Sequence, residues 1–266
     1  LITILIVTGF LVYKMISSSR KQEGYKRWKA TGSGDTANEE TAGNKWKHGA
    51  WLRHALGVTT PKARTYPVFD EEAVVWCAGL LGVEAVRLKE ILQDVSSHYR
   101  EFWIRKRKGG YRMISAPDKE LKSIQDTIYH RILLPVNVHP VATGFRRQHS
   151  IVDNVRPHLG KRCVLKTDIH DFFLSIRSPR VKQTFENIGY PKNISKVLGE
   201  LCCRRRHLPQ GASTSPALSN IIAYEMDRKL AAMAEEFGLA YTRYADDLTF
   251  SGDVFPKEQV LVRVKE

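Results

Sequence analysis

Cysteine, acidic residues and long apolar runs are all scarce in this sequence. Only four of its 266 residues are cysteine, none paired as C-x-x-C, which argues against a disulfide scaffold or a zinc module and favours a reducing compartment. Aspartate and glutamate number 28 against 42 lysines and arginines, giving a formal net charge of +14. Such an excess in a folded chain predicts a polyanionic partner, either nucleic acid or an acidic membrane surface.

The rest of the composition is that of a globular protein. Hydrophobic residues make up 42% and charged residues 26% of the chain, enough for a sizeable core. Wholesale disorder, a collagen-like chain and a multi-span membrane protein are therefore excluded. At roughly 100–200 residues per domain, the length allows one large domain or two small ones.

The first twelve residues form a strongly apolar run that starts at Leu1. A membrane-spanning helix needs about 20 apolar residues, more than this run contains. Because the first residue is Leu and not Met, we expect the sequence to begin inside a longer protein and residues 1–19 to be a hydrophobic or transmembrane anchor. A cleaved signal segment and a buried helix are the alternatives. Basic residues follow this run, and such a flank stays on the cytoplasmic side of a membrane. They are Arg20, Lys21, Lys26, Arg27 and Lys29.

Beyond this run the chain divides by composition. Residues 20–65 are rich in small polar residues and lysine and predict a basic flexible linker. From Asp70, a candidate N-cap, apolar residues recur at helical spacing. The expected elements are helices over 70–81, 83–95, 119–134 and from 179, a hairpin over 102–114, a strand over 163–167, one long helix over 216–237, and strands over 240–244 and 248–251.

Two adjacent aspartates, Asp246 and Asp247, lie in the tight turn between the last two strands. Carboxylates this close repel each other, and a divalent cation such as Mg²⁺, which prefers oxygen ligands, removes the repulsion. Solvated turn aspartates are the plainer alternative. Asp168, directly after the strand over 163–167, supplies a third carboxylate. Three carboxylates converging from two strand ends suit two metal ions about 3.5–4 Å apart, as in polymerases and some nucleases.

Three segments around these aspartates resemble motifs of the reverse transcriptases. Residues 244–247 (YADD) are similar to their YxDD box, residues 167–173 (TDIHDFF) to their first carboxylate motif, and residues 208–216 (LPQGASTSP) to the loop and helix start between the two. The segments occur in the family's order and at its spacing. The resemblance implies an α+β fold with the fingers and palm of a right-hand polymerase, the antiparallel palm sheet being packed on helices.

Two further segments resemble the bacterial retron reverse transcriptases. Asn154-Val-Arg-Pro-His158 is similar to the retron NAxxH box, with Val155 in place of its alanine, and residues 144–151 are similar to the fingers segment before it. The retron VTG signature would follow beyond Glu266, and the thumb lies outside the sequence. We therefore expect an N-terminal helical region over 66–100, the fingers over 101–162 and an incomplete palm over 163–266.

The resemblance also assigns the catalytic, metal-binding carboxylates. They would be Asp168, Asp246 and Asp247, holding two Mg²⁺ ions, with Mn²⁺ as an alternative. Asp168 and Asp246 rank ahead as direct ligands, and Asp247 would have a supporting role or lie at the primer end. Ile169 would add at most its backbone carbonyl.

Other residues are expected at the incoming nucleotide. Phe173 matches the bulky residue that excludes a 2′-hydroxyl and so selects dNTPs, whereas Phe172 is expected in the core. Arg112, helped by Lys106 and Lys108, is the candidate clamp for the β- and γ-phosphates. The remaining candidates are Asp171 near the triphosphate (or a solvated helix-start residue), Gln210 and Gly211 before the long helix, and Tyr244.

Basic and polar residues would meet the RNA. The tract Arg204-Arg205-Arg206 is expected at the template–primer phosphates. Asn154 and His158 would hold a loop that is either structural or in contact with RNA.

The resemblance thus implies a retron-type RNA-directed DNA polymerase that adds dNTPs to a primer on a structured noncoding RNA, giving an RNA–DNA hybrid. It further implies anti-phage defence beside an effector protein, with a cytoplasmic catalytic body that the N-terminal segment would anchor to the inner membrane. The alternatives are another bacterial reverse transcriptase, of group II intron-like or abortive-infection type, and a non-catalytic RNA-binding scaffold.

Overall fold

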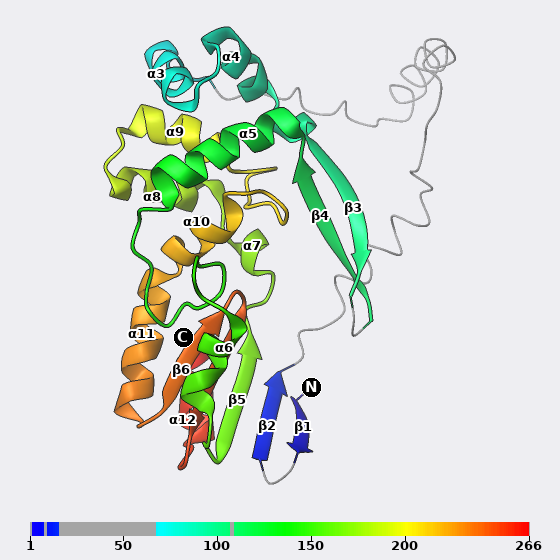
Figure 1. The fold of residues 1–266 in the computed structure, drawn as a ribbon, viewed down its shortest axis with the longest axis vertical. Helices are drawn as coiled ribbons and strands as arrows, with labels where there is room; N and C mark the ends of the chain where they lie inside the picture. Colours follow the sequence, from blue (N-terminus) through cyan, green and yellow to red (C-terminus); the bar gives the residue numbers. More distant parts are fainter. Residues whose placement is uncertain (1, 8–9, 16–67, 107–108, 266) are drawn as a thin grey trace, which may run out of the picture.

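The computed structural model describes residues 2–7, 10–15, 68–106 and 109–265 (Figure 1). The α-helices are α3 (Glu71–Leu81), α4 (Ala85–Gln93), α5 (Lys119–Ile128), α6 (Ile151–Val155), α7 (Phe172–Ser175), α8 (Ser178–Ile188), α9 (Lys192–Leu201), α10 (Ser215–Ile222), α11 (Tyr224–Glu236) and α12 (Lys257–Lys265). The strands are β1 (Ile2–Val7), β2 (Phe10–Met15), β3 (Tyr99–Arg105), β4 (Tyr111–Pro117), β5 (Cys163–Asp168), β6 (Ala240–Tyr244) and β7 (Asp247–Gly252).

One end of the molecule is helical and the other is built on a sheet (Figure 1). Helices α3, α4, α5, α8 and α9 share one apolar core. The predicted helix over 70–81 is confirmed as α3: the Asp70 carboxylate accepts a hydrogen bond from Ala73 N at 2.9 Å, and Gly82 ends the helix in the left-handed region. This helical end supports the hairpin β3–β4, which stands out to one side (Figure 1).

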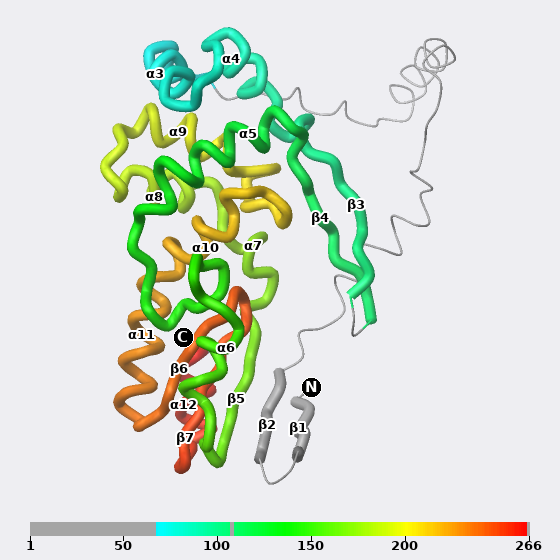
Figure 2. Tube along the Cα trace, in the orientation of Figure 1, coloured from blue at the N-terminus to red at the C-terminus, as the bar shows by residue number. Residues whose placement is uncertain are grey.

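The larger sheet has the strand order β1-β2-β5-β7-β6. Strands β5, β7 and β6 are antiparallel neighbours, as expected for the palm, whereas β2 joins β5 in parallel. One face of β5 and β7 is apolar, because Leu165, Leu248 and Phe250 are buried in a core shared with α11 and α12. The connection from α5 to β5 crosses to β6, where Ala142 bridges Arg243 (Figure 2).

The N-terminal run differs from the expected hydrophobic or transmembrane helix. Residues 2–7 and 10–15 are the antiparallel strands β1 and β2. β-Branched residues dominate residues 2–7 (ITILIV) and favour strand over helix, a preference that outweighs uniform hydrophobicity in so short a run. Among the described residues, no helix is both long enough and apolar enough to cross a membrane. The predicted linker over 20–65 lies outside the described residues.

The expected long helix over 216–237 is two helices, α10 and α11, that meet at Ala223. The hydrogen bonds from Ala223 N to Ser219 O and from Asp227 N to Ala223 O persist, so the junction is a bend rather than a full break. Alanine is the strongest helix former, so local propensity gave no sign of this bend. The expected start is also displaced by one residue, since α10 begins at Ser215.

Candidate active site

The strand register brings two of the three predicted carboxylates together. Asp168, the last residue of β5, is the Cα partner of Asp247, the first residue of β7. Directly opposed residues of antiparallel strands point to the same face, with Cβ atoms about 5 Å apart. The backbone N–H of Ile169 donates to the carbonyl of Asp246 at 2.8 Å, which ties the end of β5 to the turn. All three aspartates therefore lie at one end of the palm sheet.

The three carboxylates differ in their surroundings. Asp168 and Asp246 are exposed, whereas Asp247 is half-buried and pairs with Lys166 Nζ at 2.9 Å. Asp246 lines a cavity of about 310 Å³, and Asp168 lines a neighbouring cavity of about 510 Å³. As the side chains are placed, no three His, Cys, Asp or Glu residues of the described chain gather closely enough to hold a metal ion. The backbone thus clusters the aspartates, while their side chains are not arranged as a finished metal site.

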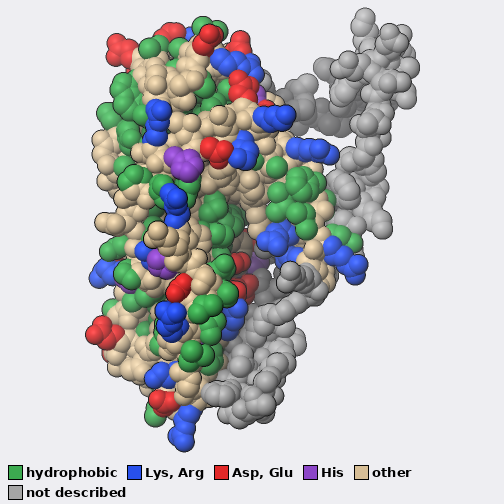
Figure 3. Space-filling model, in the orientation of Figure 1, with side chains coloured by type: hydrophobic (Ala, Val, Ile, Leu, Met, Phe, Trp, Pro, Cys, Tyr) green, Lys and Arg blue, Asp and Glu red, His purple; other side chains and the backbone are tan. Residues whose placement is uncertain are grey.

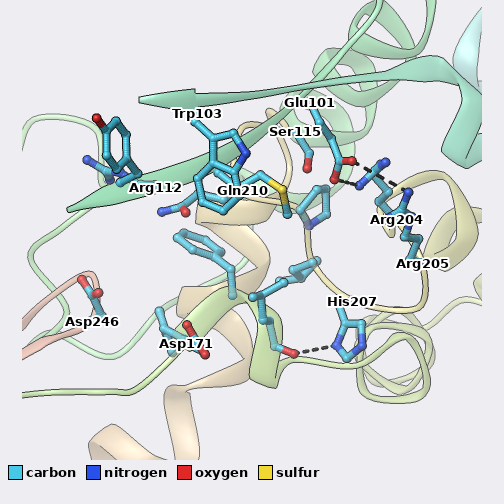
Figure 4. A pocket seen from close by; sticks show the side chains of 17 residues that line it. Glu101, Trp103, Arg112, Ser115, Asp171, Arg204, Arg205, His207, Gln210 and Asp246 are labelled. Carbon is cyan, nitrogen blue, oxygen red and sulfur yellow. Dashed lines mark hydrogen bonds and ion pairs between the residues drawn. The ribbon is translucent and has the colours of Figure 1, made fainter. Parts of the chain in front are cut away.

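The 310 Å³ cavity lies between the hairpin β3–β4 and the palm (Figure 4). Trp103 and Arg112 enter it from the hairpin, and Asp171 and Asp246 lie on the opposite side (Figure 4). The space-filling view shows acidic side chains in this recess, with Lys and Arg side chains nearby (Figure 3). Of the residues predicted at the nucleotide or the metal ions, Arg112, Asp171, Phe173, Gln210 and Asp246 line it, and so do Arg204 and Arg205 of the predicted RNA-binding tract. The arrangement suits a ligand that carries both a flat ring and negative charge.

The loop before α10 holds the hairpin in place. Ser115 N donates to Gln210 O at 2.8 Å. Gly211 follows at φ +131°, and a Cβ there would lie 2.8 Å from Ser115 O. Only glycine accommodates both the backbone conformation and this close approach. Gln210 and Gly211 thus help to build the cavity, one by lining it and the other by letting the loop pack on β4.

The two phenylalanines after Asp171 lie in different environments, one in the core and one at the cavity. Phe172 is buried, which confirms its predicted place in the core, and the Arg243 guanidinium lies 5.7 Å from the centre of its ring. Phe173 is half-buried, lines the cavity and contacts Phe145 with ring centres 6.1 Å apart. Phe173 is therefore placed where a ring can shape the ligand space.

Tyr244, Asp171 and Lys108 were also predicted near the incoming nucleotide. Tyr244 is half-buried at the end of β6 and is the Cα partner of Asp247. Asp171 stands in the left-handed region at φ +49°, within 3.4 Å of His170 Nδ1. Lys108 lies outside the described residues.

Of the three predicted RNA-binding arginines, Arg204 is tied to the protein. Its guanidinium forms an ion pair with Glu101 on β3 and lies 5.8 Å from the centre of the Tyr99 ring. The side chain is only 9% exposed, whereas that of Arg205 is 68% exposed and lies farther from the same carboxylate, with Nη2 3.8 Å from Glu101 Oε2. Arg206 is also exposed. The sequence gave no sign of the partner Glu101, because the two residues are 103 positions apart.

Asn154 and His158 pack against the palm rather than facing outward. Asn154 is buried, and its side-chain oxygen accepts a hydrogen bond from Thr143 Oγ1 at 2.9 Å. The two His158 ring nitrogens lie 2.7 Å from Ser251 Oγ and 2.7 Å from Thr242 Oγ1. Burial lowers the pKa of His158, so the neutral ring is favoured. Of the two roles expected for this loop, the contacts favour the structural one.

A buried charged cluster beneath the turn was missed from the sequence. Arg243 and Asp227 form an ion pair in which both side chains are 0% exposed. Asn220 Oδ1 and the Tyr241 hydroxyl complete the cluster. An arginine in a strand that ends in YADD is the only local signal, and its partners lie on α10 and α11.

Residues 104–263 match the family described as "Reverse transcriptase (RNA-dependent DNA polymerase)". The chain belongs to the reverse transcriptase family. This match confirms the resemblance drawn from the three motifs, and with it the fold of mixed helices and antiparallel strands.

Curated relatives of this reverse transcriptase chain are of the retron type, as predicted. It is 37% identical to the retron Ec86 reverse transcriptase of Escherichia coli over 179 residues, covering 66% of this chain and 55% of that protein. It is 39% identical to the retron Mx65 reverse transcriptase of Myxococcus xanthus over 174 residues, covering 59% of this chain and 41% of that protein. It is 32% identical to the retron Mx162 reverse transcriptase of the same organism over 255 residues, covering 87% of this chain and 52% of that protein. The chain spans about half the length of these relatives. A Candida albicans telomerase structure aligns at 13% identity with a TM-score of 0.41, over 63% of this chain and 39% of that one.

Proposed function

We propose that this reverse transcriptase chain carries the catalytic carboxylates of an RNA-directed DNA polymerase that extends a primer with dNTPs. The observation that supports this most is the register that pairs Asp168 with Asp247 and bonds Ile169 to Asp246. It brings Asp168 and Asp246, which are 78 residues apart in sequence, to one end of the palm sheet, beside a cavity that Asp246 lines and that has Arg112 on its opposite side. That is the layout needed to bring a triphosphate to carboxylates.

The donor chemistry of this edge fits a divalent cation. Asp168 and Asp246 offer exposed carboxylates, and hard ions such as Mg²⁺ and Mn²⁺ prefer oxygen ligands. Asp168, Asp246 and the Ile169 carbonyl would hold the ions, whereas Asp247, already paired with Lys166, would support them. Bound metal ions would lower the pKa of the attacking primer hydroxyl and neutralise charge on the leaving pyrophosphate.

The residues of the cavity would hold and orient the nucleotide. Arg112 would contact the phosphates, since a guanidinium can donate two hydrogen bonds at once to a phosphate. Phe173 would lie under the sugar and leave no room for a 2′-hydroxyl. Gln210 would hydrogen-bond near the base pair, while Trp103 would cover it from the hairpin.

The retron relatives support a structured noncoding RNA as template and primer, with an RNA–DNA hybrid as product. Exposed Arg205 and Arg206 would meet phosphates of this RNA, whereas Arg204 would steady the loop that presents them. The defence role, the effector protein and the inner-membrane tether stay predictions from the sequence.

Primer extension by the full-length protein tests this function. Asp246→Ala should lower dNTP incorporation on an RNA template by on the order of 10³-fold, because a carboxylate that holds metal ions is lost. Asp168→Ala should behave alike. The matched control is Asp253→Ala, since Asp253 is an exposed aspartate that follows the opposite end of β7. Equal synthesis by wild type and Asp246→Ala would overturn the proposal and favour the RNA-binding scaffold.

A further inference from the structure

Arg243 is a fully buried arginine in the strand that leads into the turn, and the proposed chemistry gives it no role. Its guanidinium donates from Nε and Nη2 to the two carboxylate oxygens of Asp227, at 2.8 and 2.6 Å. Its Nη1 donates to Asn220 Oδ1 at 3.0 Å and to the backbone carbonyl of Ala245 at 2.9 Å. A guanidinium is planar, so bonds on three sides fix its orientation completely.

The bond to Ala245 bears directly on Asp246. The Ala245 carbonyl belongs to the peptide that joins Ala245 to Asp246. The carbonyl of Asp246 itself accepts a hydrogen bond from Ile169 N at 2.8 Å. Both peptides that flank Asp246 are therefore held, one by a buried side chain and the other by the end of β5. An exposed carboxylate thus stands on a backbone that cannot turn freely.

The turn needs such support, because its backbone is unfavourable. Ala245 has φ +58°, in the left-handed region that a residue with a Cβ seldom adopts. Gly144 packs so closely beneath it that an added Cβ would lie 2.6 Å from Ala245 N. The segment that holds Gly144 is itself bonded to β6, since Arg243 N donates to Val141 O and Thr143 N donates to Arg243 O, both at 2.8 Å.

Stability alone does not account for a charged cluster at this place. A buried ion pair gains little over well-packed apolar residues of similar size, because two charges must lose their water. What apolar residues cannot supply is a donor for the Ala245 carbonyl. The cluster joins α10, α11 and the turn through a single side chain, which gives the turn one fixed direction.

We propose that Arg243 is a positioning residue, which sets the direction of the Asp246 carboxylate by holding the Ala245 carbonyl. Asp227 and Asn220 orient the guanidinium for this task. The inference rests on the proposed function of Asp246, and it concerns a residue that touches neither nucleotide nor metal.

The test is Arg243→Lys in the full-length protein. Lysine keeps the charge beside Asp227, but one ammonium cannot reproduce the fork that reaches Asp227, Asn220 and Ala245 together. We expect kcat for dNTP incorporation to fall about 10²-fold, as for a misplacement of about 1 Å, with KM for dNTP within about twofold of wild type. Mn²⁺ binding, followed by electron paramagnetic resonance without nucleotide, should weaken in parallel.

Two further variants separate positioning from stability. Asn220→Ala keeps the Arg243–Asp227 pair but removes one acceptor of Nη1 and the hydrogen bond from Asn220 Nδ2 to the Gly144 carbonyl. We expect kcat to fall by less than in Arg243→Lys, again with KM for dNTP unchanged. Leu88→Ala, in the buried face of α4, lowers stability far from the turn and should leave kcat and Mn²⁺ affinity unchanged at temperatures well below melting.

The outcomes distinguish the two proposals. Wild-type kcat and Mn²⁺ affinity in a folded Arg243→Lys protein would overturn the positioning role while leaving polymerase activity intact. A loss of kcat in Leu88→Ala equal to that in Arg243→Lys would also overturn it. If Asp246→Ala is as active as wild type, the proposed function fails, and Mn²⁺ affinity in Arg243→Lys still decides whether Arg243 shapes this turn.

Discussion

The two walls of the nucleotide cavity are held in opposite ways. The palm wall rests on a fully buried ion pair, Arg243–Asp227, and on hydrogen bonds to both peptides around Asp246. The fingers wall is a two-stranded hairpin. Its base is held by the buried Tyr99, whose hydroxyl accepts a hydrogen bond from Gln125 Nε2, and farther along it is joined to the body through the partly exposed Glu101–Arg204 pair and the Ser115–Gln210 hydrogen bond.

This difference separates two kinds of function. Carboxylates that must meet metal ions need a fixed backbone, and a buried network supplies it at the cost of desolvating charges. Groups that bind a nucleotide need to be accessible to it, and the hairpin presents Arg112 as the one exposed residue of β4, whose other residues are half-buried or buried. Damage to the palm wall should therefore affect stability and kcat, whereas damage to the fingers wall should affect KM.

The largest effect is expected from Asp227→Ala on the palm side. The substitution leaves the Arg243 charge buried without its carboxylate partner, so the free energy of unfolding should fall by about 3–5 kcal/mol. Urea denaturation followed by circular dichroism measures this change.

A surface pair on the same helix provides the control. Arg228 and Glu225 form an ion pair with side chains 57% and 56% exposed. Glu225→Ala should leave the free energy of unfolding nearly unchanged, because water screens the pair. Equal losses of unfolding free energy in Asp227→Ala and Glu225→Ala would show that burial does not increase the contribution of the Arg243–Asp227 pair to stability.

Sequence reasoning found the palm carboxylates because their signal is local. A strand followed by Asp168, and a turn that contains Asp246 and Asp247, are each readable within about ten residues. The fingers hairpin was found for the same reason, since Gly109 and Gly110 mark its turn and both have positive φ. The register that pairs Asp168 with Asp247 joins strands far apart in the sequence and comes from the structure.

What escaped prediction depends on contacts between distant segments. The bend at Ala223 leaves Asn220 on α10 and Asp227 on α11, both bonded to Arg243, and none of these residue types bends a helix by itself. Arg204 was read as part of a basic surface because Glu101 lies 103 positions away. The strands at residues 2–15 were missed since short apolar runs do not distinguish helix from strand.

One glycine packed against each wall gives a finer comparison. A Cβ at Gly144 would lie 2.6 Å from Ala245 N, and one at Gly211 would lie 2.8 Å from Ser115 O. Both substitutions by alanine should cost about 1–3 kcal/mol, because backbone must shift. Gly144→Ala should lower kcat by displacing the turn, whereas Gly211→Ala should raise KM for dNTP by pushing β4 away. Steady-state kinetics of both variants measures the contrast.

Gly79→Ala is the matched control, because no atom lies within 4 Å of the added Cβ. In an exposed helical position the change should stabilise the protein by up to about 1 kcal/mol and leave kinetics unchanged. If Gly144→Ala and Gly211→Ala alter kcat and KM in the same proportion, the two walls do not have separate roles.

The smallest effect concerns the pH dependence of the palm, through His158. Burial lowers the pKa of this ring, so the unfolded chain takes up its proton first and stability should fall as pH drops below about 6.5. His158→Gln should therefore lose less of its unfolding free energy than wild type between pH 7.5 and 5.5, by less than about 1 kcal/mol, in urea titrations at both pH values. The exposed His149 is the control, and His149→Gln should keep the wild-type difference. An unchanged difference in His158→Gln would mean that protonation of this ring does not weaken the palm.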